Sequence, residues 1–372
     1  MTAQLFTPLN LGSLELKNRI VVAPMCQYSA VDGTMSDWHL MHLGQFAVGG
    51  YGLVMVEATG VEAAGRITPG CTGLWSDENE AAMARVVRFF RDYGNSPIGI
   101  QLAHAGRKAS CDVPWAGGAP LTDERKWQTS APSALPYDDN WHVPEAMDGA
   151  ALVRVRDAFV QAAERAVRAG FDVIELHGAH GYLLHEFMSP LSNQRNDEYG
   201  GSLENRQRYP LEIFDAVRAV VPDRIPVGMR VSATDWVEGG WSLDETVSLA
   251  GELKGRGCAF LDVSSAGNSP QQKIVNGPGY QVPFASEIKR NTGITTMAVG
   301  RITDPLQAET IVASGQADCV ALARGALYDP RWPWHAADAL GAQAAFPPQY
   351  MRTHPTLKST PIPANPPNTK DV

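Results

Sequence analysis

The chain has 372 residues, 44% of them hydrophobic and 19% charged, with a formal net charge of -9 and an isoelectric point near 5.5. This composition is typical of a globular protein, and the length is sufficient for one large α/β domain or two smaller ones. An acidic chain lacks the basic field that binds a DNA or RNA backbone, so we expect small-molecule partners and no nucleic acid.

The cysteines and the N-terminal segment bear on the cellular compartment. The five cysteines are scattered and form no C-x-x-C pair, which argues against a disulfide scaffold, a zinc finger or an iron–sulfur cluster. Residues 1–8 contain neither a basic region nor an apolar run, and no stretch approaches the roughly 18 apolar residues of a membrane span. We therefore expect a cytoplasmic protein that makes no membrane contact.

Eight short apolar runs have the length and composition of buried strands. They cover residues 20–23, 53–56, 98–102, 173–176, 227–231, 260–263, 297–299 and 319–322. Segments with helical periodicity, such as residues 152–169 and 203–221, lie between most of them. Such alternation produces right-handed βαβ units and a parallel sheet. Eight repeats predict a closed (β/α)8 TIM barrel, and an open Rossmann sheet is the alternative, which lacks its usual G-x-G-x-x-G fingerprint here.

The longest interval between predicted strands, about 70 residues, separates the third from the fourth. Its excess, residues 105–149, contains three tryptophans and several prolines, which favours an ordered excursion that caps the barrel mouth. Residues 355–372 are rich in proline and have no periodicity, so we expect them to be extended or disordered. The prediction is one barrel domain over residues 1–354, followed by this tail.

The end of the fourth predicted strand carries the most informative polar residues. His177, His180 and Tyr182 follow the apolar run in a turn punctuated by glycines. In barrels of this kind the active site lies at the carboxyl ends of the strands. Two imidazoles and a phenol are costly to bury unless partners or a substrate satisfy them. From the residues alone they could bind a metal, be satisfied core side chains, or contact a substrate.

The ends of the seventh and eighth predicted strands carry Gly300-Arg301 and Arg324-Gly325. Barrels commonly bind phosphate at these two loops, through backbone N–H groups and the dipole of the following helix. The alternative is that both arginines are surface charges paired with Asp304 and Asp329.

Five motifs resemble the Old Yellow Enzyme family, flavin-dependent ene-reductases built on a TIM barrel. They are Leu16-Lys-Asn-Arg-Ile20, Ala23-Pro-Met-Cys-Gln-Tyr28, Gln101-Leu-Ala-His-Ala-Gly-Arg-Lys108, His177-Gly-Ala-His-Gly-Tyr-Leu183 and Asn196-Asp-Glu-Tyr-Gly-Gly-Ser-Leu-Glu-Asn-Arg206. The resemblance extends over residues 5–352. The His-x-x-His spacing, together with Cys26, is similar to the thermophilic-like, xenobiotic reductase A-like branch.

The resemblance implies that FMN binds non-covalently at the strand ends. Its ring system would lie over Pro24, Met25 and Cys26, and its pyrimidine side would meet Ala58 and Gln101. The Cys26 thiol would tune the redox behaviour of the flavin, although without the resemblance it is an ordinary buried cysteine. A Cys26→Ala change that alters neither the flavin potential nor substrate affinity would rule that role out.

The resemblance also implies charged contacts to the cofactor. Arg230 would lie near the flavin N1–C2=O edge, where a cation stabilises the anionic reduced flavin and raises its potential. The alternative for this arginine is a salt bridge to a barrel carboxylate such as Glu175. The phosphate would bind at Gly300, Arg301, Ala323 and Arg324. Family members often have glycine in place of Ala323, whose methyl group leaves less room.

For the reaction, the resemblance implies a ping-pong cycle in which NADPH or NADH reduces FMN and an activated alkene reoxidises it. His177 and His180 would donate hydrogen bonds to the carbonyl or nitro oxygen, and Tyr182 would protonate the α-carbon. Tyr28 would close the pocket, and Arg352 would enter a neighbouring subunit's site, which implies a homodimer or homotetramer. Full activity of a strictly monomeric protein would remove that role.

Two other functions stay open. A metal-dependent barrel lyase or hydrolase could use His104, His177 and His180, and would be sensitive to chelators and free of flavin. A non-catalytic flavin-binding protein would hold FMN tightly without turning over any activated alkene.

Overall fold

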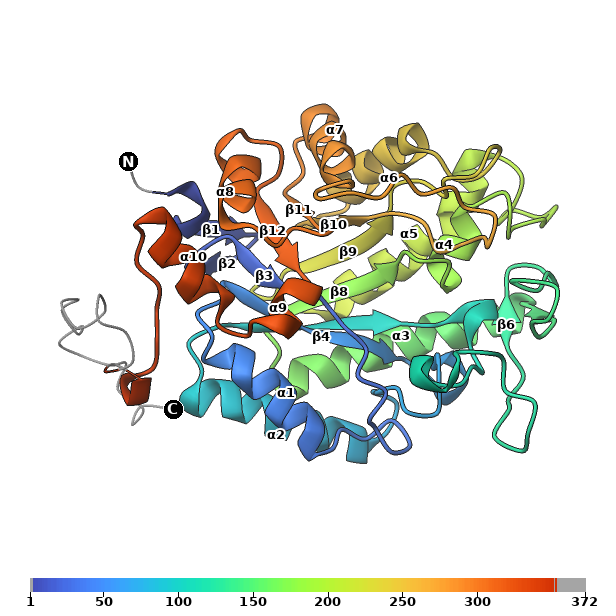
Figure 1. Cartoon of the computed structure of the whole chain (residues 1–372). Coiled ribbons are helices and arrows are strands. Elements are labelled where there is room, and N and C mark those ends of the chain that lie inside the picture. The colour runs from blue at the N-terminus through green and yellow to red at the C-terminus, as the bar shows by residue number, and fades with distance from the viewer. Residues whose placement is uncertain (1–2, 351, 353–372) are drawn as a thin grey trace.

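The computed structural model describes residues 3–350 and 352, and its central feature is a closed barrel of parallel strands (Figure 1). Around the barrel the strands follow the order β10-β11-β12-β3-β4-β5-β8-β9, and the pairing of Val320 with Ile20 closes the ring. The strands are β3 (Ile20–Val22), β4 (Leu53–Gly60), β5 (Ile98–Ala103), β8 (Val173–Gly178), β9 (Val227–Ser232), β10 (Leu261–Ser264), β11 (Thr296–Ala298) and β12 (Cys319–Leu322). The predicted (β/α)8 barrel is confirmed.

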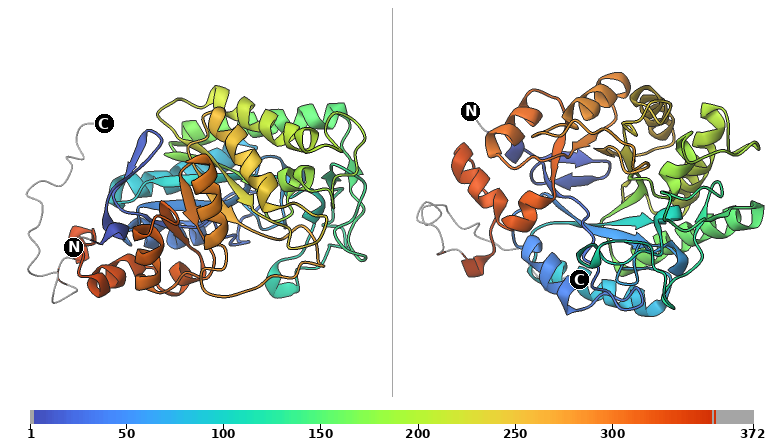
Figure 2. Two further views of the ribbon diagram at one scale, coloured as in Figure 1. Left: turned by 90° about the horizontal axis from the view of Figure 1, so that it is seen from above. Right: turned by 45° about the vertical axis from the view of Figure 1, so that its right-hand side comes forward.

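Helices surround the barrel and cover its outer face (Figure 2). They are α1 (Asp37–Ala47), α2 (Asp77–Tyr93), α3 (Gly149–Ala169), α4 (Leu183–Met188), α5 (Leu203–Val220), α6 (Leu243–Gly255), α7 (Val282–Thr292), α8 (Pro305–Ala313), α9 (Arg324–Tyr328) and α10 (Trp332–Leu340). Side-chain caps begin several of them: the Ser76, Ser202 and Ser242 hydroxyls each accept a hydrogen bond from a first-turn backbone N–H. None of the described helices combines the length and apolar character needed to cross a lipid bilayer.

A hairpin closes the amino end of the barrel. Its strands β1 (Leu9–Leu11) and β2 (Leu14–Leu16) pair antiparallel, and Leu11 and Leu16 join Phe260 in the apolar cluster inside the barrel. A Cβ at Gly12 would lie 3.2 Å from the Cβ atoms of Pro226 and Ala259, which precede β9 and β10. The hairpin therefore seals the amino ends of the strands, and access to the interior is left to the carboxyl ends.

Two strands, β4 and β8, extend at least two residues beyond the ends of the predicted apolar runs. Residues 57–59 belong to β4 rather than to a loop, because the ladder continues to pair Ala58 with Gln101 of β5 after a register shift at Val56. Likewise, His177 lies within β8 and pairs with Arg230 of β9. These strand ends were not predicted because they contain polar residues, and the prediction relied on runs of apolar residues.

The long segment between β5 and α3 lies at the carboxyl end of the barrel (Figure 1). It contains the short helices η3 (Gly106–Lys108) and η4 (Pro114–Ala116) and the paired strands β6 (Ser130–Ala131) and β7 (Glu145–Ala146). The buried Arg107 ties it to the β10–α7 loop, because its guanidinium donates to the carbonyl oxygens of Pro136 at 3.2 Å and Asn268 at 2.7 Å. The tail predicted over residues 355–372 lies outside the described residues.

The remaining short helices are η1 (Gln4–Phe6), η2 (Ala63–Gly65) and η5 (Pro348–Tyr350).

Candidate active site at the carboxyl ends of the strands

His177 and His180 lie face to edge at the end of β8. Their ring centroids are 5.1 Å apart with an interplanar angle of 86°, and His177 Nε2 is 3.4 Å from His180 Nδ1. The backbone N–H of Ala179 donates to His177 Nδ1 at 3.2 Å. Since an acceptor nitrogen carries no proton, the neutral His177 ring carries its proton on Nε2.

Both imidazoles are neutral. Burial, and then the positive charge of Arg230, lowers the pKa of His177 and of His180 well below the ordinary histidine value. A neutral imidazole keeps one N–H donor without a full positive charge, so the pair can hydrogen-bond a substrate oxygen without fixing it as an ion pair.

The backbone of His180 is held in an uncommon conformation with φ 60°. Its N–H donates to the Ser232 hydroxyl at 2.9 Å, and its carbonyl oxygen accepts from Lys108 Nζ at 2.7 Å. Gly267, with φ +95°, packs so closely that a Cβ there would lie 2.5 Å from the His180 backbone. Three loops, after β5, β8 and β10, thus meet at one residue.

Gly267→Ala is expected to destabilise the protein by about 2–4 kcal/mol, because the new methyl group adds a steric clash to an unfavourable φ. Gly315→Ala is the matched control: its φ is +74°, yet a Cβ there meets no described atom within 4 Å. Thermal or urea unfolding of both variants measures the difference. Equal losses would show that backbone conformation alone, and not contact with His180, makes glycine necessary at position 267.

Tyr182 lies beside His177 and precedes α4. Its ring is perpendicular to that of His177, with centroids 5.0 Å apart. Burial raises the pKa of the Tyr182 phenol well above its ordinary value, so the group is protonated at neutral pH.

Lys108 also lies at this site. It ends the motif at residues 101–108, but no function was predicted for it from the sequence. Its ammonium lies 5.1 Å from the Tyr182 ring centroid and 4.8 Å from that of Tyr137, and donates to the carbonyl oxygens of His180 and Gly267 at 2.7 and 2.8 Å. Burial lowers the pKa of Lys108 to about 8. The available signal was a lysine in the short helix η3 that follows β5.

The segment after β3 brings Pro24, Met25, Cys26 and Tyr28 to the same end of the barrel. Its backbone is fixed by Gln27, whose N–H donates to the buried Glu57 carboxylate at 2.9 Å. A hydrogen bond with the Cys71 thiol, and then burial, raises the pKa of Cys26 well above its ordinary value, so the thiol stays protonated. The Tyr28 ring packs edge to face against Trp115, with ring centroids 5.8 Å apart.

Ala58, Gln101 and Arg230 lie on three strands at the mouth of the barrel. Gln101 Nε2 donates to Glu175 at 2.8 Å, while Arg230 Nε lies 3.3 Å from Asp262. Arg230 therefore pairs with a barrel carboxylate, as the alternative suggested, but that carboxylate is Asp262 of β10 and not Glu175. Burial, and then the Asp262 carboxylate, raises the pKa of Glu175 to about 8, which limits the negative charge beneath the arginine.

The two predicted phosphate loops are neighbours because β11 pairs with β12. Gly300 and Arg301 both have positive φ, 129° and 53°, and a Cβ at Gly325 would lie 3.5 Å from the Ile302 carbonyl oxygen. Arg301 lies 3.4 Å from Asn276 and Arg324 is exposed. Ala323 immediately precedes α9.

The carboxylates suggested as alternative partners for these arginines have other contacts. Asp304 accepts from the backbone N–H of Gln307 and caps α8, and Asp329 lies 2.5 Å from His335.

The donor set at this end of the barrel fits FMN. Within the described part of the chain, Asp262 is the only side-chain partner found for the Arg230 guanidinium, so its other N–H groups are available to a flavin N1–C2=O edge. Gln101 uses its amide nitrogen on Glu175 and retains its amide oxygen for a flavin N–H. The glycine-containing loops after β11 and β12 offer backbone N–H groups to a phosphate.

Two predicted residues lie apart from this cluster. Both ring nitrogens of His104 have protein contacts, with Glu62 at 3.1 Å and the Gly106 N–H at 3.1 Å, so His104 does not join the histidine pair. Across residues 3–350 and 352, no three His, Cys, Asp or Glu side chains gather in a metal-ligating group. Arg352 is exposed in a turn near the end of the described chain.

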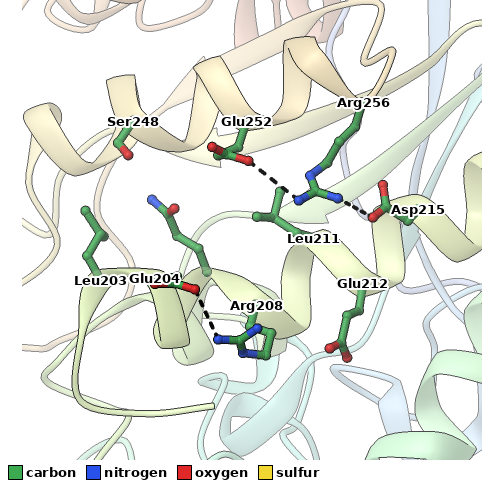
Figure 3. Close-up of a pocket in the computed structure, with 10 residues that line it drawn as sticks. Leu203, Glu204, Arg208, Leu211, Glu212, Asp215, Ser248, Glu252 and Arg256 are labelled. Atoms are coloured by element: carbon green, nitrogen blue, oxygen red, sulfur yellow. Dashed lines mark hydrogen bonds and ion pairs between the residues drawn. The ribbon is translucent and has the colours of Figure 1, made fainter. Parts of the chain in front are cut away.

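A cavity of about 590 Å³ lies elsewhere, between α5 and α6 on the outer layer (Figure 3). Its lining is largely charged, and Arg256 forms ion pairs there with Asp215 and Glu252. None of the predicted site residues lines it.

The barrel and the polar side chains at its mouth fit a flavin-dependent oxidoreductase. Residues 4–343 match the model of the NADH:flavin oxidoreductase / NADH oxidase family, and the chain belongs to that family. This membership confirms the predicted family resemblance, the enzyme class, and the cofactors, FMN and a nicotinamide dinucleotide.

Known proteins resemble the chain over nearly its whole length. It is 45% identical over 354 residues to an NADPH dehydrogenase of Geobacillus sp. (strain WCH70), covering 95% of this chain and 99% of that protein. It is 42% identical over 354 residues to the NADPH dehydrogenase of Bacillus subtilis (strain 168), with the same coverage. Among solved structures, morphinone reductase superposes with a TM-score of 0.76 at 28% identity, over 96% of this chain and 93% of that one.

Proposed function

We propose that this enzyme reduces activated alkenes, α,β-unsaturated carbonyl or nitro compounds, by NAD(P)H-dependent ene reduction. The observation that carries the proposal is the convergence of His177 Nε2 and His180 Nδ1, 3.4 Å apart, beside the Tyr182 phenol. An activated alkene gains a hydride on one carbon and a proton on the next. The two neutral imidazoles can stabilise the charge on its oxygen, and the Tyr182 phenol can supply the proton.

FMN would be held by the residues that fit it. When bound, it accepts a hydride from the nicotinamide and delivers it to the β-carbon of the alkene. Pro24, Met25 and Cys26 would support the ring system, Ala58 and Gln101 would contact its pyrimidine side, and Arg230 would stabilise negative charge on it. The phosphate would be bound by the two neighbouring loops, at Gly300, Arg301, Ala323 and Arg324.

The histidine pair would bind the carbonyl oxygen and stabilise the charge that reaches it as the alkene is reduced. Preplaced N–H donors act in this way because they need no reorganisation when the charge develops. Tyr182 would then donate its phenolic proton to the α-carbon. Tyr28 would close the pocket beside Trp115, to which its ring already packs.

The reductant and the alkene would occupy the same pocket in turn, in a ping-pong cycle. A nicotinamide is a reasonable occupant, since morphinone reductase, 29% identical to this chain, has been solved in complex with tetrahydroNAD. Arg352 would complete the site of a neighbouring subunit in a homodimer or homotetramer, which size measurements on the wild type and an Arg352→Ala variant would test.

The first measurement is an anaerobic absorbance titration of the purified protein. We expect flavin bands that bleach with NADPH and return on addition of cyclohexenone. A protein that binds FMN and is bleached by NADPH, but is not reoxidised by any enone or nitroalkene, would contradict the proposal.

Lys108→Met is expected to slow enone-dependent reoxidation about tenfold, the size expected for loss of a partly desolvated cation beside an aromatic ring. The ammonium stabilises the tyrosinate that Tyr182 becomes on losing its proton. Because the pKa of Lys108 is about 8, the wild-type rate should fall as the pH rises through that value and the charge is lost. Stopped-flow reoxidation between about pH 7 and 9 measures this.

The control is Glu186→Gln, since burial also raises the pKa of Glu186 to about 8 and this carboxylate accepts from the Arg107 N–H. If the pH step disappears in Glu186→Gln and persists in Lys108→Met, the assignment to Lys108 is wrong.

A further inference from the structure

Ser264 is the last residue of β10, and its hydroxyl lies 2.8 Å from His180 Nε2. The side chain is buried, and no sequence motif marked it. The backbone N–H and carbonyl oxygen of His180 bond to Ser232 and Lys108, and its Nε2 lies beside Ser264. The one remaining polar atom of His180 is Nδ1, which faces His177 Nε2.

Two proton arrangements satisfy these contacts. In the first, the Ser264 hydroxyl donates to His180 Nε2, so the neutral ring carries its proton on Nδ1. Both His177 Nε2 and His180 Nδ1 are then N–H donors 3.4 Å apart, which cannot bond each other and can share one acceptor oxygen. In the second, His180 Nε2–H donates to Ser264, and Nδ1 accepts from His177, so that no donor faces the substrate.

The surroundings of Ser264 favour the first arrangement when an acceptor oxygen is present. The second arrangement turns the serine proton toward Gln281 Oε1 at 3.4 Å, a distance at which a hydrogen bond is weak. That amide oxygen already accepts from the Ser265 hydroxyl at 2.6 Å, and the amide nitrogen donates to the Val299 carbonyl oxygen at 3.1 Å. The serine proton is better placed on His180.

We propose that Ser264 is a positioning residue that fixes His180 as the Nδ1–H tautomer and so makes the histidine pair a two-donor site for an anionic oxygen. The inference rests on the proposed function, because it assigns the pair to a substrate oxygen. It states which ring nitrogen of His180 carries the proton, and it adds no step to the reaction.

The test is a two-bond ¹H–¹⁵N correlation spectrum of ¹⁵N-histidine-labelled, oxidised holoenzyme saturated with para-nitrophenol, whose phenolate oxygen imitates an enolate. The His180 signals are assigned by their loss in His180→Ala. We expect a protonated Nδ1 and an unprotonated Nε2 in the wild type. In Ser264→Ala the Nε2–H form should appear, and para-nitrophenol should bind about tenfold more weakly.

Ser264→Thr keeps the hydroxyl and should restore both the tautomer and the affinity. Ser265→Ala removes a neighbouring hydroxyl that contacts Gln281 and not His180, and so frees the Gln281 amide oxygen. Because Ser264 would still lie 3.4 Å from that oxygen and 2.8 Å from His180 Nε2, this variant should keep the His180 tautomer. A protonated Nε2 in ligand-bound wild type overturns the inference even if Ser264→Ala does not fold. An unchanged tautomer and affinity in a folded Ser264→Ala overturns it as well.

Failure of the proposed function is a separate result. It would be seen in the wild type as an absence of reoxidation by any enone or nitroalkene, whereas the tautomer is measured without turnover.

Discussion

Tyr182→Phe is expected to slow reoxidation of the reduced enzyme by cyclohexenone by about 10²- to 10⁴-fold, the contribution typical of a positioned general acid. The change removes one hydroxyl and leaves the ring beside His177 and over the Lys108 ammonium, so the packing of the loop is retained. Flavin reduction by NADPH transfers a hydride without a proton from this group. Its rate should stay within about twofold of the wild type.

Stopped-flow absorbance separates the two half-reactions. A quinone acceptor, which receives its protons on oxygen and not on carbon, is the internal control and should reoxidise the variant at the wild-type rate. If Tyr182→Phe slows NADPH oxidation and enone reduction equally, Tyr182 supports the site structurally and is not the proton donor.

His177→Ala is expected to lower the rate of enone-dependent reoxidation by about 10²–10³-fold, as loss of one preplaced oxyanion donor does in other enzymes. The His177 proton lies on Nε2, directed toward the position that a substrate oxygen would share with His180 Nδ1. Because the imidazole is neutral, its loss removes a directional donor and not a counter-charge. Weaker binding of para-nitrophenol should accompany the slower rate.

His177→Asn provides the comparison, because its amide can still donate a hydrogen bond and should recover part of the rate and of the ligand affinity. FMN content and the unfolding temperature check that both variants are folded, since His177 is buried in β8. Reoxidation of folded His177→Ala at the wild-type rate would exclude this residue from stabilising the substrate oxygen.

The barrel could be predicted because parallel strands in this fold are covered on both faces. Such strands appear in the sequence as short, mostly apolar runs, and all eight runs became strands although four of them carry a polar residue: Gln101, Glu175, Arg230 or Asp262. The ends of the strands were harder to predict. Glu57, Thr59 and His177 are polar, and only the backbone ladder shows that β4 and β8 continue through them.

The site motifs could be located from the sequence, but not the contacts that organise them. Ser264 is 84 residues from His180, and Lys108 is 72 residues from it. A serine or lysine at such a separation has no local pattern that marks it, because the contact is created by closure of the barrel. The same reason explains why the partner of Arg230 proved to be Asp262 on the adjacent strand.

The hairpin of β1 and β2 has a consequence for inhibition. With the amino end of the barrel filled by Leu11 and Leu16, every molecule that reaches the interior enters and departs by one opening. If the reductant and the acceptor bind in turn at this opening, as we propose, each excludes the other, and an excess of either should act as a competitive inhibitor of the other. The enzyme would then distinguish the reductant from the acceptor by how long each stays bound at the mouth of the barrel, and less by separate binding surfaces.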